Sequence, residues 1–299
     1  MSFHHVSVLL HETVDALNLK AGDIVVDATF GGGGHSTEVL KQIGSSGRLI
    51  AIDRDIDAIK NARTHVHHAN YDDIARVLCG EKVDGILADL GLSSHQINTV
   101  ERGFSYMNDA ELDMRMDSSS DKKGKTAFSI VNHMKESELA DLIYKYGEER
   151  YSRQIATNIV KNRPISTTLE LAKICEASVP GNYYKFFGHP AKKTFQAIRI
   201  AVNDELGSLE RFLPDAIDSL KPGGRIAIIT FHSLEDRIVK QTFKKFASEC
   251  LCPPKTPMCI CGHKQTLKIV TKKPILPSAD ELYMNPRSAS AKLRVAEKI

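Results

Sequence analysis

Short β-rich runs alternate with helical segments from residue 22 to residue 89, and this alternation limits the possible folds more than any other feature. A strand, helix, strand order favours a parallel sheet with right-handed crossovers. We therefore expect an α/β fold with a doubly wound, Rossmann-like sheet. The expected strands are Ile24–Asp27, Arg48–Asp53, Val66–His68 and Val83–Asp89. The expected helices are Ser36–Ile43, with Ser36 as its cap, Asp55–Arg63 and Asp72–Leu78.

The alternation then stops for about a hundred residues, between positions 106 and 206, where amphipathic helical patterns replace it. Leu139, Leu142 and Ile143 share one helix face, and Thr167 with Glu170 has the pattern of a capping box. The polar stretch 117–125 reads as a mobile loop. We expect residues 106–206 to form an inserted all-helical domain within a discontinuous domain made of residues 1–105 and 207–299.

The α/β pattern resumes after the insertion. We expect a helix over Leu206–Leu220, stopped by the sequence KPGG, and a buried strand over Arg225–Phe231. A further helix begins at about Ser233, and Thr266–Thr271 and Lys292–Glu297 read as the last two strands. These elements complete the sheet.

Four consecutive glycines, Gly31 to Gly34, follow the first expected strand. Their spacing does not fit the G-x-G-x-x-G dinucleotide pattern, and His35 stands where a phosphate-binding P-loop needs lysine. A glycine turn before a helix still lets a ligand approach the backbone, and the helix start favours a negative group there. Tight packing of strand against helix is the alternative reading of the glycines.

Three expected strands end in an acid, namely Asp27, Asp53 and Asp89. Ligands of open α/β sheets bind beyond the carboxyl ends of the strands, so these acids and the glycines would face one crevice. S-adenosylmethionine fits such a site, with its ribose on Asp53, its cationic tail near the acids and its carboxylate on the glycine-loop amides. Taken singly, Asp27 could be a turn residue and Asp53 a solvated one.

The composition is that of an ordinary globular protein, with 42% hydrophobic and 26% charged residues. We see neither a signal peptide nor an apolar run of membrane-spanning length, so we expect a cytoplasmic location. The net charge of +3 decides nothing about nucleic acid, but Lys185–Arg199 holds four basic residues and no acid. A solvated face is the alternative reading of that segment.

Four of the six cysteines are spaced C-x-C-x6-C-x-C, at positions 250, 252, 259 and 261. Disulfides are disfavoured in the cytoplasm, so a tetrahedral thiolate metal site competes with plain free thiols. Structural zinc more often uses C-x2-C pairs, and no metal is assigned to the candidate site.

Further long motifs give the chain a resemblance to the MraW (RsmH) family of bacterial ribosomal RNA methyltransferases. They include DGILADLGLSSHQ (Asp84–Gln96), HPAKKTFQAIRIAVNDEL (His189–Leu206) and PGGRIAIITFHSLEDR (Pro222–Arg237), and they span nearly the whole chain. The resemblance implies methyl transfer from S-adenosylmethionine to the exocyclic N4 amine of a cytidine in 16S ribosomal RNA, in the decoding region of the small subunit. It also implies a set of cofactor-binding residues, which comprises Gly33, Gly34, His35, Asp53, Tyr71, Asp89 and Gln96. Asp27 joins this set because of its place at the end of the first expected strand.

Cytosine N4 is a poor nucleophile, because its lone pair is delocalised into the ring. An acceptor must therefore hold an N–H while the amine attacks the methyl group, and we expect Asp89 to act with Ser93, Ser94 or nearby backbone carbonyls. His232 is a further candidate for the target pocket, with a structural histidine as the alternative. Lys185–Arg199, with Phe186, Phe187 and Phe195, is the candidate RNA-binding segment on the inserted domain.

Two other functions stay open at this point. One is a methyltransferase with a protein or small-molecule acceptor, for which the insertion would be a lid. The other is a non-catalytic ribosome-assembly factor. The expected partner is small-subunit ribosomal RNA or the assembled 30S subunit, with no membrane involved. The oligomeric state stays open, a homodimer being one option.

Overall fold

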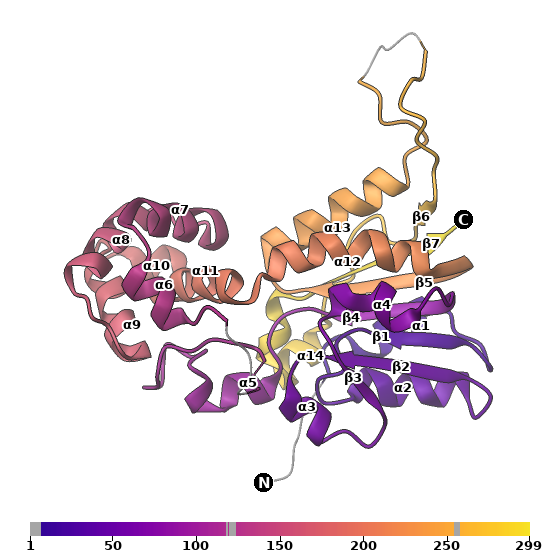
Figure 1. Cartoon of the computed structure of the whole chain (residues 1–299), viewed down its shortest axis with the longest axis horizontal. Coiled ribbons are helices and arrows are strands. Elements are labelled where there is room, and N and C mark those ends of the chain that lie inside the picture. The colour runs from indigo at the N-terminus through magenta and orange to yellow at the C-terminus, as the bar shows by residue number, and fades with distance from the viewer. Residues whose placement is uncertain (1–6, 118, 120–123, 254–257) are drawn as a thin grey trace. The chain divides into compact units, whose positions relative to one another are not determined.

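A sheet of seven strands lies at the centre of the first of two units in the computed structural model (Figure 1), which describes residues 7–117, 119, 124–253 and 258–299. The strand order is β3-β2-β1-β4-β5-β7-β6. The five neighbouring strands β3, β2, β1, β4 and β5 pair in parallel. Strand β7 is antiparallel to both β5 and β6. Their bounds are β1 (Ile24–Asp27), β2 (Arg48–Asp53), β3 (Val66–His68), β4 (Val83–Asp89), β5 (Leu220–Thr230), β6 (Leu267–Ile269) and β7 (Lys292–Lys298).

Side chains alternate between the two faces of the sheet, so each strand feeds two apolar layers. Val26 and Ile86 pack with α12 and α13 on one face, while their neighbours Val25 and Leu87 pack with α1 and α2 on the other. Both layers are almost fully buried, which explains the continuous apolar runs of β1, β4 and β5. The helices of this unit are α1 (Leu10–Leu17), α2 (Gly34–Ile43), α3 (Ile56–Lys60), η1 (Tyr71–Asp73), α4 (Ile74–Leu78), α12 (Glu205–Ser219), α13 (Ser233–Phe246), α14 (Ala279–Met284) and η3 (Pro286–Ser290).

The expected fold class is confirmed, and β1 to β4 have the expected bounds. The predicted start of β5 was wrong. The strand begins at Leu220, which pairs with Val83 before a register shift. The KPGG sequence therefore lies within the strand. The helix cap was also wrong. Gly33 occupies the N-cap position of α2, and Ser36 lies in the first turn with its hydroxyl turned to Asp27.

The chain divides into two compact units, one with residues up to Gly91 together with Leu206–Ile299, and one with Leu92–Glu205. The second unit therefore starts earlier than the expected position 106, because Leu92 and Phe104 pack into its apolar core. Part of the expected mobile loop, at 118 and 120–123, lies outside the described residues.

The second unit is helical. Its core joins Ile143 of α7, Ile155 of α8, Leu171 of α9 and Ile198 of α11, all almost fully buried. The capping box of Thr167 and Glu170 opens α9 as expected. The helices of this unit are α5 (Ser94–Asn98), η2 (Val100–Arg102), α6 (Ala127–His133), α7 (Glu136–Gly147), α8 (Ser152–Lys161), α9 (Thr168–Ala177), α10 (Tyr183–Phe187) and α11 (Ala191–Asn203).

Among the described residues, none of the helices is long and apolar enough to span a lipid bilayer.

Candidate active site

The three acids that end β1, β2 and β4 lie at the same edge of the sheet, since these strands are parallel neighbours. Asp27 is the most buried, with 1% of its surface exposed. Its two oxygens accept the N–H of Thr29 at 3.2 Å and the hydroxyl of Ser36 at 2.6 Å. Burial raises the pKa of Asp27 to about 6. Through these two bonds Asp27 holds the loop that joins β1 to α2.

Asp53 ties the second strand to the glycine turn. Its Oδ2 accepts the N–H of Gly31 at 2.7 Å, and its Oδ1 accepts the N–H of Asp55 at 2.7 Å. Burial raises the pKa of Asp53 above its usual value, although these two bonds oppose the shift. Each carboxylate oxygen keeps a second lone pair, so Asp53 can still accept from the hydroxyls of a ribose.

Tyr71 lies just beyond β3, near Asp53 along the sheet edge. The carbonyl oxygen of Asp53 accepts the N–H of Ala69 at 3.0 Å, which brings the Tyr71 turn beside the tip of β2. The Tyr71 ring packs edge-to-face on Phe212 of α12, with 5.2 Å between the ring centroids. Tyr71 is partly buried against the core, and its role toward an adenine stays a prediction.

The glycine turn needs glycine partly for reasons internal to the protein. Gly33 has a φ of +74°, and a Cβ there would lie 2.7 Å from the ring of Phe30. A Cβ on Gly34 would lie 2.0 Å from the hydroxyl oxygen of Ser7. Gly33 is thus restricted by packing and backbone conformation and Gly34 by packing, which is the alternative that the sequence had left open.

The start of α2 is nevertheless available to an anion. Gly33 at the N-cap has no side chain to bond the first amides of α2, and no acid lies in the first turn. Unbonded N–H groups at a helix start, together with the helix dipole, favour a carboxylate. The sequence analysis predicted that the carboxylate of the cofactor binds here.

His35 points from α2 toward Asp89. Its Nε2 lies 3.1 Å from the carbonyl oxygen of Val8, and since a carbonyl only accepts, Nε2 carries a proton. Its Nδ1 lies 4.0 Å from Oδ2 of Asp89. The buried ring is thus committed to protein groups, and the backbone N–H of His35 is the part that faces the helix start.

Of the three acids, Asp89 is the one with a buried carboxylate oxygen that accepts no hydrogen bond from a described residue. Its Oδ1 is buried and has no hydrogen-bond partner among the described residues, while its backbone N–H donates to Thr29 Oγ1 at 2.7 Å. Burial raises the pKa of Asp89 well above its usual value, and the charges of Asp27, Glu235 and Glu281 add to that shift. An unpaired buried carboxylate oxygen among acids is costly, so the arrangement fits a cation or an N–H donor supplied by a ligand.

Sequence reasoning missed Glu235 and Glu281. Glu281 lies on α14, and its Oε1 accepts the N–H of Leu9 at 2.8 Å. The S-x-x-E spacing of Ser278 and Glu281 at the start of this helix is a signal that could have found it. Glu235 belongs to a capping box whose first residue is histidine rather than serine or threonine, which made the motif hard to see.

That histidine is His232, the candidate for the target pocket. Its Nδ1 accepts the N–H of Glu235 at 3.3 Å, and its Nε2 lies 3.2 Å from Oε1 of Glu235. The side chain is buried and caps α13. These contacts match the structural alternative for His232, and its role in catalysis stays a prediction.

Ser93, Ser94 and Gln96 belong to the helical unit. Ser93 caps α5, and its Oγ accepts the N–H of Gln96 at 3.2 Å, while the Gln96 side chain accepts the N–H of Ser93 at 3.0 Å. Gln96 is buried, with 5% of its surface exposed, and its role toward the cofactor stays a prediction. Ser94 is the first residue of α5, and its side chain lies outside what the structure describes.

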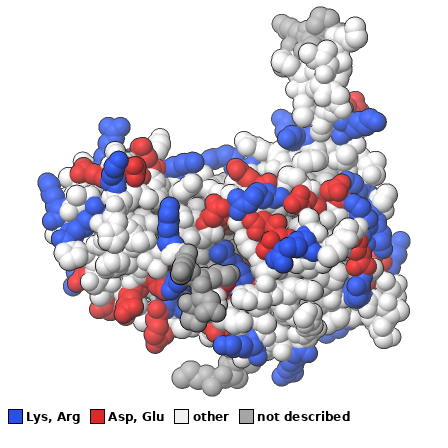
Figure 2. Space-filling view, in the orientation of Figure 1, with Lys and Arg blue, Asp and Glu red and all other residues white. Residues whose placement is uncertain are grey.

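The expected RNA-binding segment is only partly at the surface. Phe195 is 3% exposed within the helical core, and Arg199 forms two bonds of 2.9 Å to the carboxylate of Glu205. These two residues are therefore structural. Lys192 is exposed, and Phe186 is 64% exposed beneath the ammonium of Lys185. Figure 2 shows basic and acidic side chains interspersed on the face in view, in keeping with the small net charge.

Comparison with known proteins decides the family. A sequence model of the MraW methylase family matches residues 2–299. The chain belongs to the MraW methylase family. Ribosomal RNA small subunit methyltransferase H of Clostridium botulinum (strain 657 / Type Ba4) is 49% identical over 313 residues, which cover all of both chains. The enzyme of that name from Brevibacillus brevis is 48% identical over 314 residues, covering 100% of this chain and 99% of its own.

A solved structure, a putative rRNA-methylase from Clostridium thermocellum, is also similar. It is 13% identical with a TM-score of 0.45, and the match covers 98% of this chain and 99% of that one. Likeness at this level adds nothing to the family assignment.

Membership of a methylase family confirms the expectation of a methyltransferase that uses S-adenosylmethionine. The residues at the sheet edge suit this molecule chemically. A methyl-bearing sulfonium is a cation, which suits the acids around Asp89, and its amino-acid carboxylate suits the bare start of α2.

Proposed function

We propose that this methyltransferase transfers a methyl group from S-adenosylmethionine to the N4 amine of a cytidine in the decoding region of small-subunit ribosomal RNA. Two lines support the proposal: full-length similarity to proteins named as small-subunit ribosomal RNA methyltransferases, and the site at the sheet edge. The single structural observation that carries it is the unpartnered Oδ1 of Asp89 at the tip of β4.

The cofactor would be held by groups from the start of α2, the end of β2 and the turn after β3. The N–H groups at the start of α2, at Gly34 and His35, would bind its carboxylate, and Asp53 would accept from the ribose hydroxyls. Tyr71 would contact the adenine. Asp27 would act indirectly, because its bonds to Thr29 and Ser36 hold the turn and the first turn of α2.

Asp89 would supply the acceptor for the amine. Bound S-adenosylmethionine supplies an electrophilic methyl group and a positive charge. That charge favours the ionised form of Asp89, whose pKa is otherwise raised by burial and by the neighbouring acids. The ionised Oδ1 can accept one N–H of the amine, which turns the nitrogen lone pair out of the ring plane and toward the methyl group.

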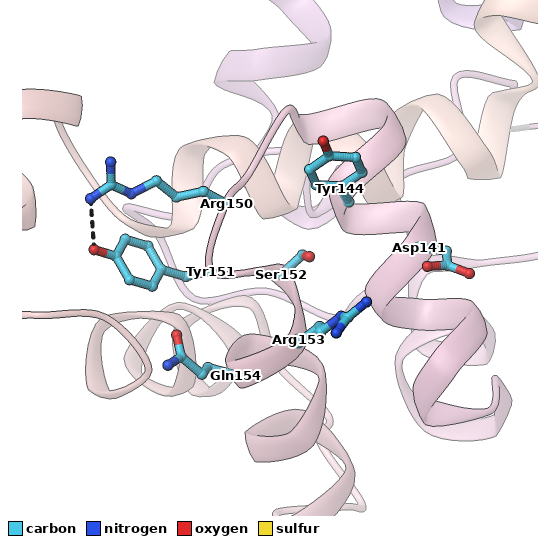
Figure 3. A pocket seen from close by; sticks show the side chains of 7 residues that line it. All are labelled: Asp141, Tyr144, Arg150, Tyr151, Ser152, Arg153 and Gln154. Carbon is cyan, nitrogen blue, oxygen red and sulfur yellow. Dashed lines mark hydrogen bonds between the residues drawn. The ribbon is translucent and has the colours of Figure 1, made fainter.

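The helical unit offers a surface suited to RNA. Residues of α7, α8 and the turn between them line a hollow, and they include both arginines and tyrosines (Figure 3). Arg150 donates to the hydroxyl of Tyr151 at 2.9 Å, and its guanidinium lies 4.9 Å from the ring centroids of Tyr151 and Phe187. Tyr144 is 64% exposed. Exposed aromatic rings beside arginines are the groups on which unpaired bases stack.

A methyl-transfer assay with tritiated cofactor tests the proposal. We expect label to enter small ribosomal subunits, or ribosomal RNA stripped of protein, and nuclease digestion should release it as N4-methylated cytidine. Label in protein or in a small molecule of a cell extract, with none in the RNA, would contradict the proposed acceptor. Offering naked RNA beside assembled subunits also identifies the preferred substrate. An RNA substrate of this kind places the protein in the cytoplasm.

A further inference from the structure

The segment between α13 and β6, residues 247–266, contains no helix or strand among its described residues. Figure 1 shows it reaching away from these two elements. Its large apolar side chains face solvent, with exposed fractions of 42% for Leu251, 76% for Met258 and 84% for Ile260. Loops of this length without secondary structure are uncommon unless something other than an apolar core orders them.

The segment carries the four cysteines noted in the sequence, and the structure brings their sulfur atoms together. All four Sγ atoms lie within 4.8 Å of one another. The Sγ of Cys259 lies 3.5 Å from that of Cys250, 3.5 Å from that of Cys261 and 4.0 Å from that of Cys252. The Sγ atoms of Cys250 and Cys261 are 3.8 Å apart.

These separations match a tetrahedron of thiolates around one metal ion. A zinc–sulfur bond of about 2.3 Å places the sulfurs of a regular tetrahedron roughly 3.8 Å apart. A disulfide needs a separation of about 2.05 Å, so the sulfurs are too far apart to be bonded. An iron–sulfur cluster spreads its thiolates around several iron ions, which a set this close does not allow.

Backbone N–H groups near both C-x-C pairs donate to the same sulfur atoms. The N–H of Leu251 donates to the Sγ of Cys261 at 3.4 Å, and the N–H of Ile260 donates to the Sγ of Cys252 at 3.4 Å. The N–H of Cys252 donates to the Sγ of Cys250 at 3.3 Å. Such bonds stabilise thiolates and orient metal ligands. They also fix the two C-x-C pairs opposite each other, which compensates for the absence of the commoner C-x2-C spacing.

The ligand set selects the kind of ion. Four sulfurs suit a soft or borderline ion with tetrahedral preference, whereas calcium and magnesium need oxygen ligands. The sequence has no carboxylate between Glu249 and Asp280 to supply one. We propose that Cys250, Cys252, Cys259 and Cys261 bind one Zn²⁺ ion that holds the 247–266 segment in its folded form.

Metal analysis of the purified full-length protein tests the zinc site. We expect about one zinc per chain by mass spectrometry of the elements. The double variant Cys259→Ser/Cys261→Ser should hold less than a tenth of that, while Cys79→Ser, which changes an exposed cysteine elsewhere, should keep it all. Circular dichroism of the double variant checks that the sheet and the helices persist.

A second measurement uses the unmodified chain. A thiol-modifying reagent should release the zinc to a coloured chelator, and trypsin should then cut within 247–266 faster than before release. Cobalt(II) in place of zinc should give the strong visible absorption of a tetrahedral thiolate site. Three results would overturn the proposal: no bound metal and a mass lower by four hydrogens, as two disulfides require; equal zinc in the double variant; or iron in place of zinc.

Discussion

Nδ1 of His35 lies 4.0 Å from Oδ2 of Asp89, so the start of α2 and the tip of β4 meet through two titratable side chains. Nε2 of His35 is protonated toward Val8, which leaves Nδ1 facing the carboxyl group of Asp89. Burial and the charges of neighbouring acids raise the pKa of Asp89, so a ligand that brings a cation to this carboxyl group favours its ionised form.

Replacing Asp89 with asparagine tests its effect on stability and its role in methyl transfer separately. The variant Asp89→Asn should unfold at a higher denaturant concentration than the wild type at pH 8, because a buried charge is removed. Its kcat for methyl transfer should fall roughly 10²- to 10³-fold, since the amide is a weaker acceptor for the amine. Asp218→Asn, at an exposed acid, is the control and should change neither. Wild-type kcat with wild-type cofactor affinity would refute the acceptor role.

Removing the Asp53 carboxylate should weaken cofactor binding. Charge-assisted bonds to the ribose contribute about 1.5–3 kcal/mol, so Asp53→Ala should raise the Kd of S-adenosylmethionine roughly 10- to 100-fold. Isothermal titration calorimetry measures this directly. Because Asp53 also holds the N–H of Gly31, Asp53→Asn, which keeps one acceptor oxygen, should lose less affinity than alanine. Equal affinity in all three proteins would remove Asp53 from the cofactor site.

Asp27 should give the protein a pH-dependent stability. Its pKa of about 6 in the folded chain exceeds the usual 3.8, so the folded state holds the proton more tightly than the unfolded state. Its contribution is fully present below about pH 4 and is lost as the pH rises through 6. Two pKa units correspond to about 3 kcal/mol.

Denaturant titrations of wild type and Asp27→Asn at pH 4 and pH 7 check this. The asparagine variant does not titrate, so its stability relative to wild type should rise by about 3 kcal/mol between these pH values. A difference that stays constant with pH would show that Asp27 titrates normally in the folded chain.

The close packing of Ser7 on Gly34 predicts that a substitution at Ser7 partly restores the stability lost by a substitution at Gly34. A Cβ at Gly34 would lie 2.0 Å from Oγ of Ser7, so Gly34→Ala should lower the melting temperature and weaken cofactor binding. Ser7→Ala removes that oxygen but leaves Cβ of Ser7 at 3.1 Å, so the double variant should recover part of the loss. Differential scanning calorimetry of the four proteins gives the coupling energy. Additive effects would mean that the clash is relieved elsewhere.

Basic residues of the helical unit should control the salt dependence of RNA binding. Arg153 lines the hollow on α8, and Lys192 is exposed on α11. The pair Arg153→Glu/Lys192→Glu should raise KM for the RNA and flatten its dependence on salt, with cofactor affinity unchanged. Lys173→Glu/Lys161→Glu makes the same change of charge on other exposed lysines of the unit. If both pairs shift the salt slope equally, the effect is one of net charge and not of this surface.

The sequence predicted the strands near the glycine turn well, because buried parallel strands are short apolar runs that end abruptly at Asp27, Asp53 and Asp89. The cap of α2 could not be predicted from local preferences, since the hydroxyl of Ser36 is used by Asp27, nine residues away. Contacts across long stretches of chain decide such cases. The hydrogen bond between Leu9 and Glu281, which are far apart in the sequence, is another example.

The structure shows which protein groups the predicted cofactor residues contact, and several of these contacts were not predicted. Gly33 and Gly34 read as a ligand cradle, yet Phe30 and Ser7 already exclude side chains there. His232 read as a pocket residue, and its ring caps α13. Ser7 is distant from Gly34 in the sequence, whereas Phe30 and Glu235 lie only three residues from Gly33 and His232, so both local and distant contacts set these geometries.

The neighbours β4 and β5 are separated along the chain by the entire helical unit. During synthesis, the half-sheet formed by β1 to β4 therefore emerges first, with one side of β4 unpaired until β5 has been made. The helical unit has its own apolar core, so it can collapse in that interval and shorten the path between its ends. Any change that delays this collapse prolongs the exposure of β4 and gives aggregation more time to compete with completion of the sheet.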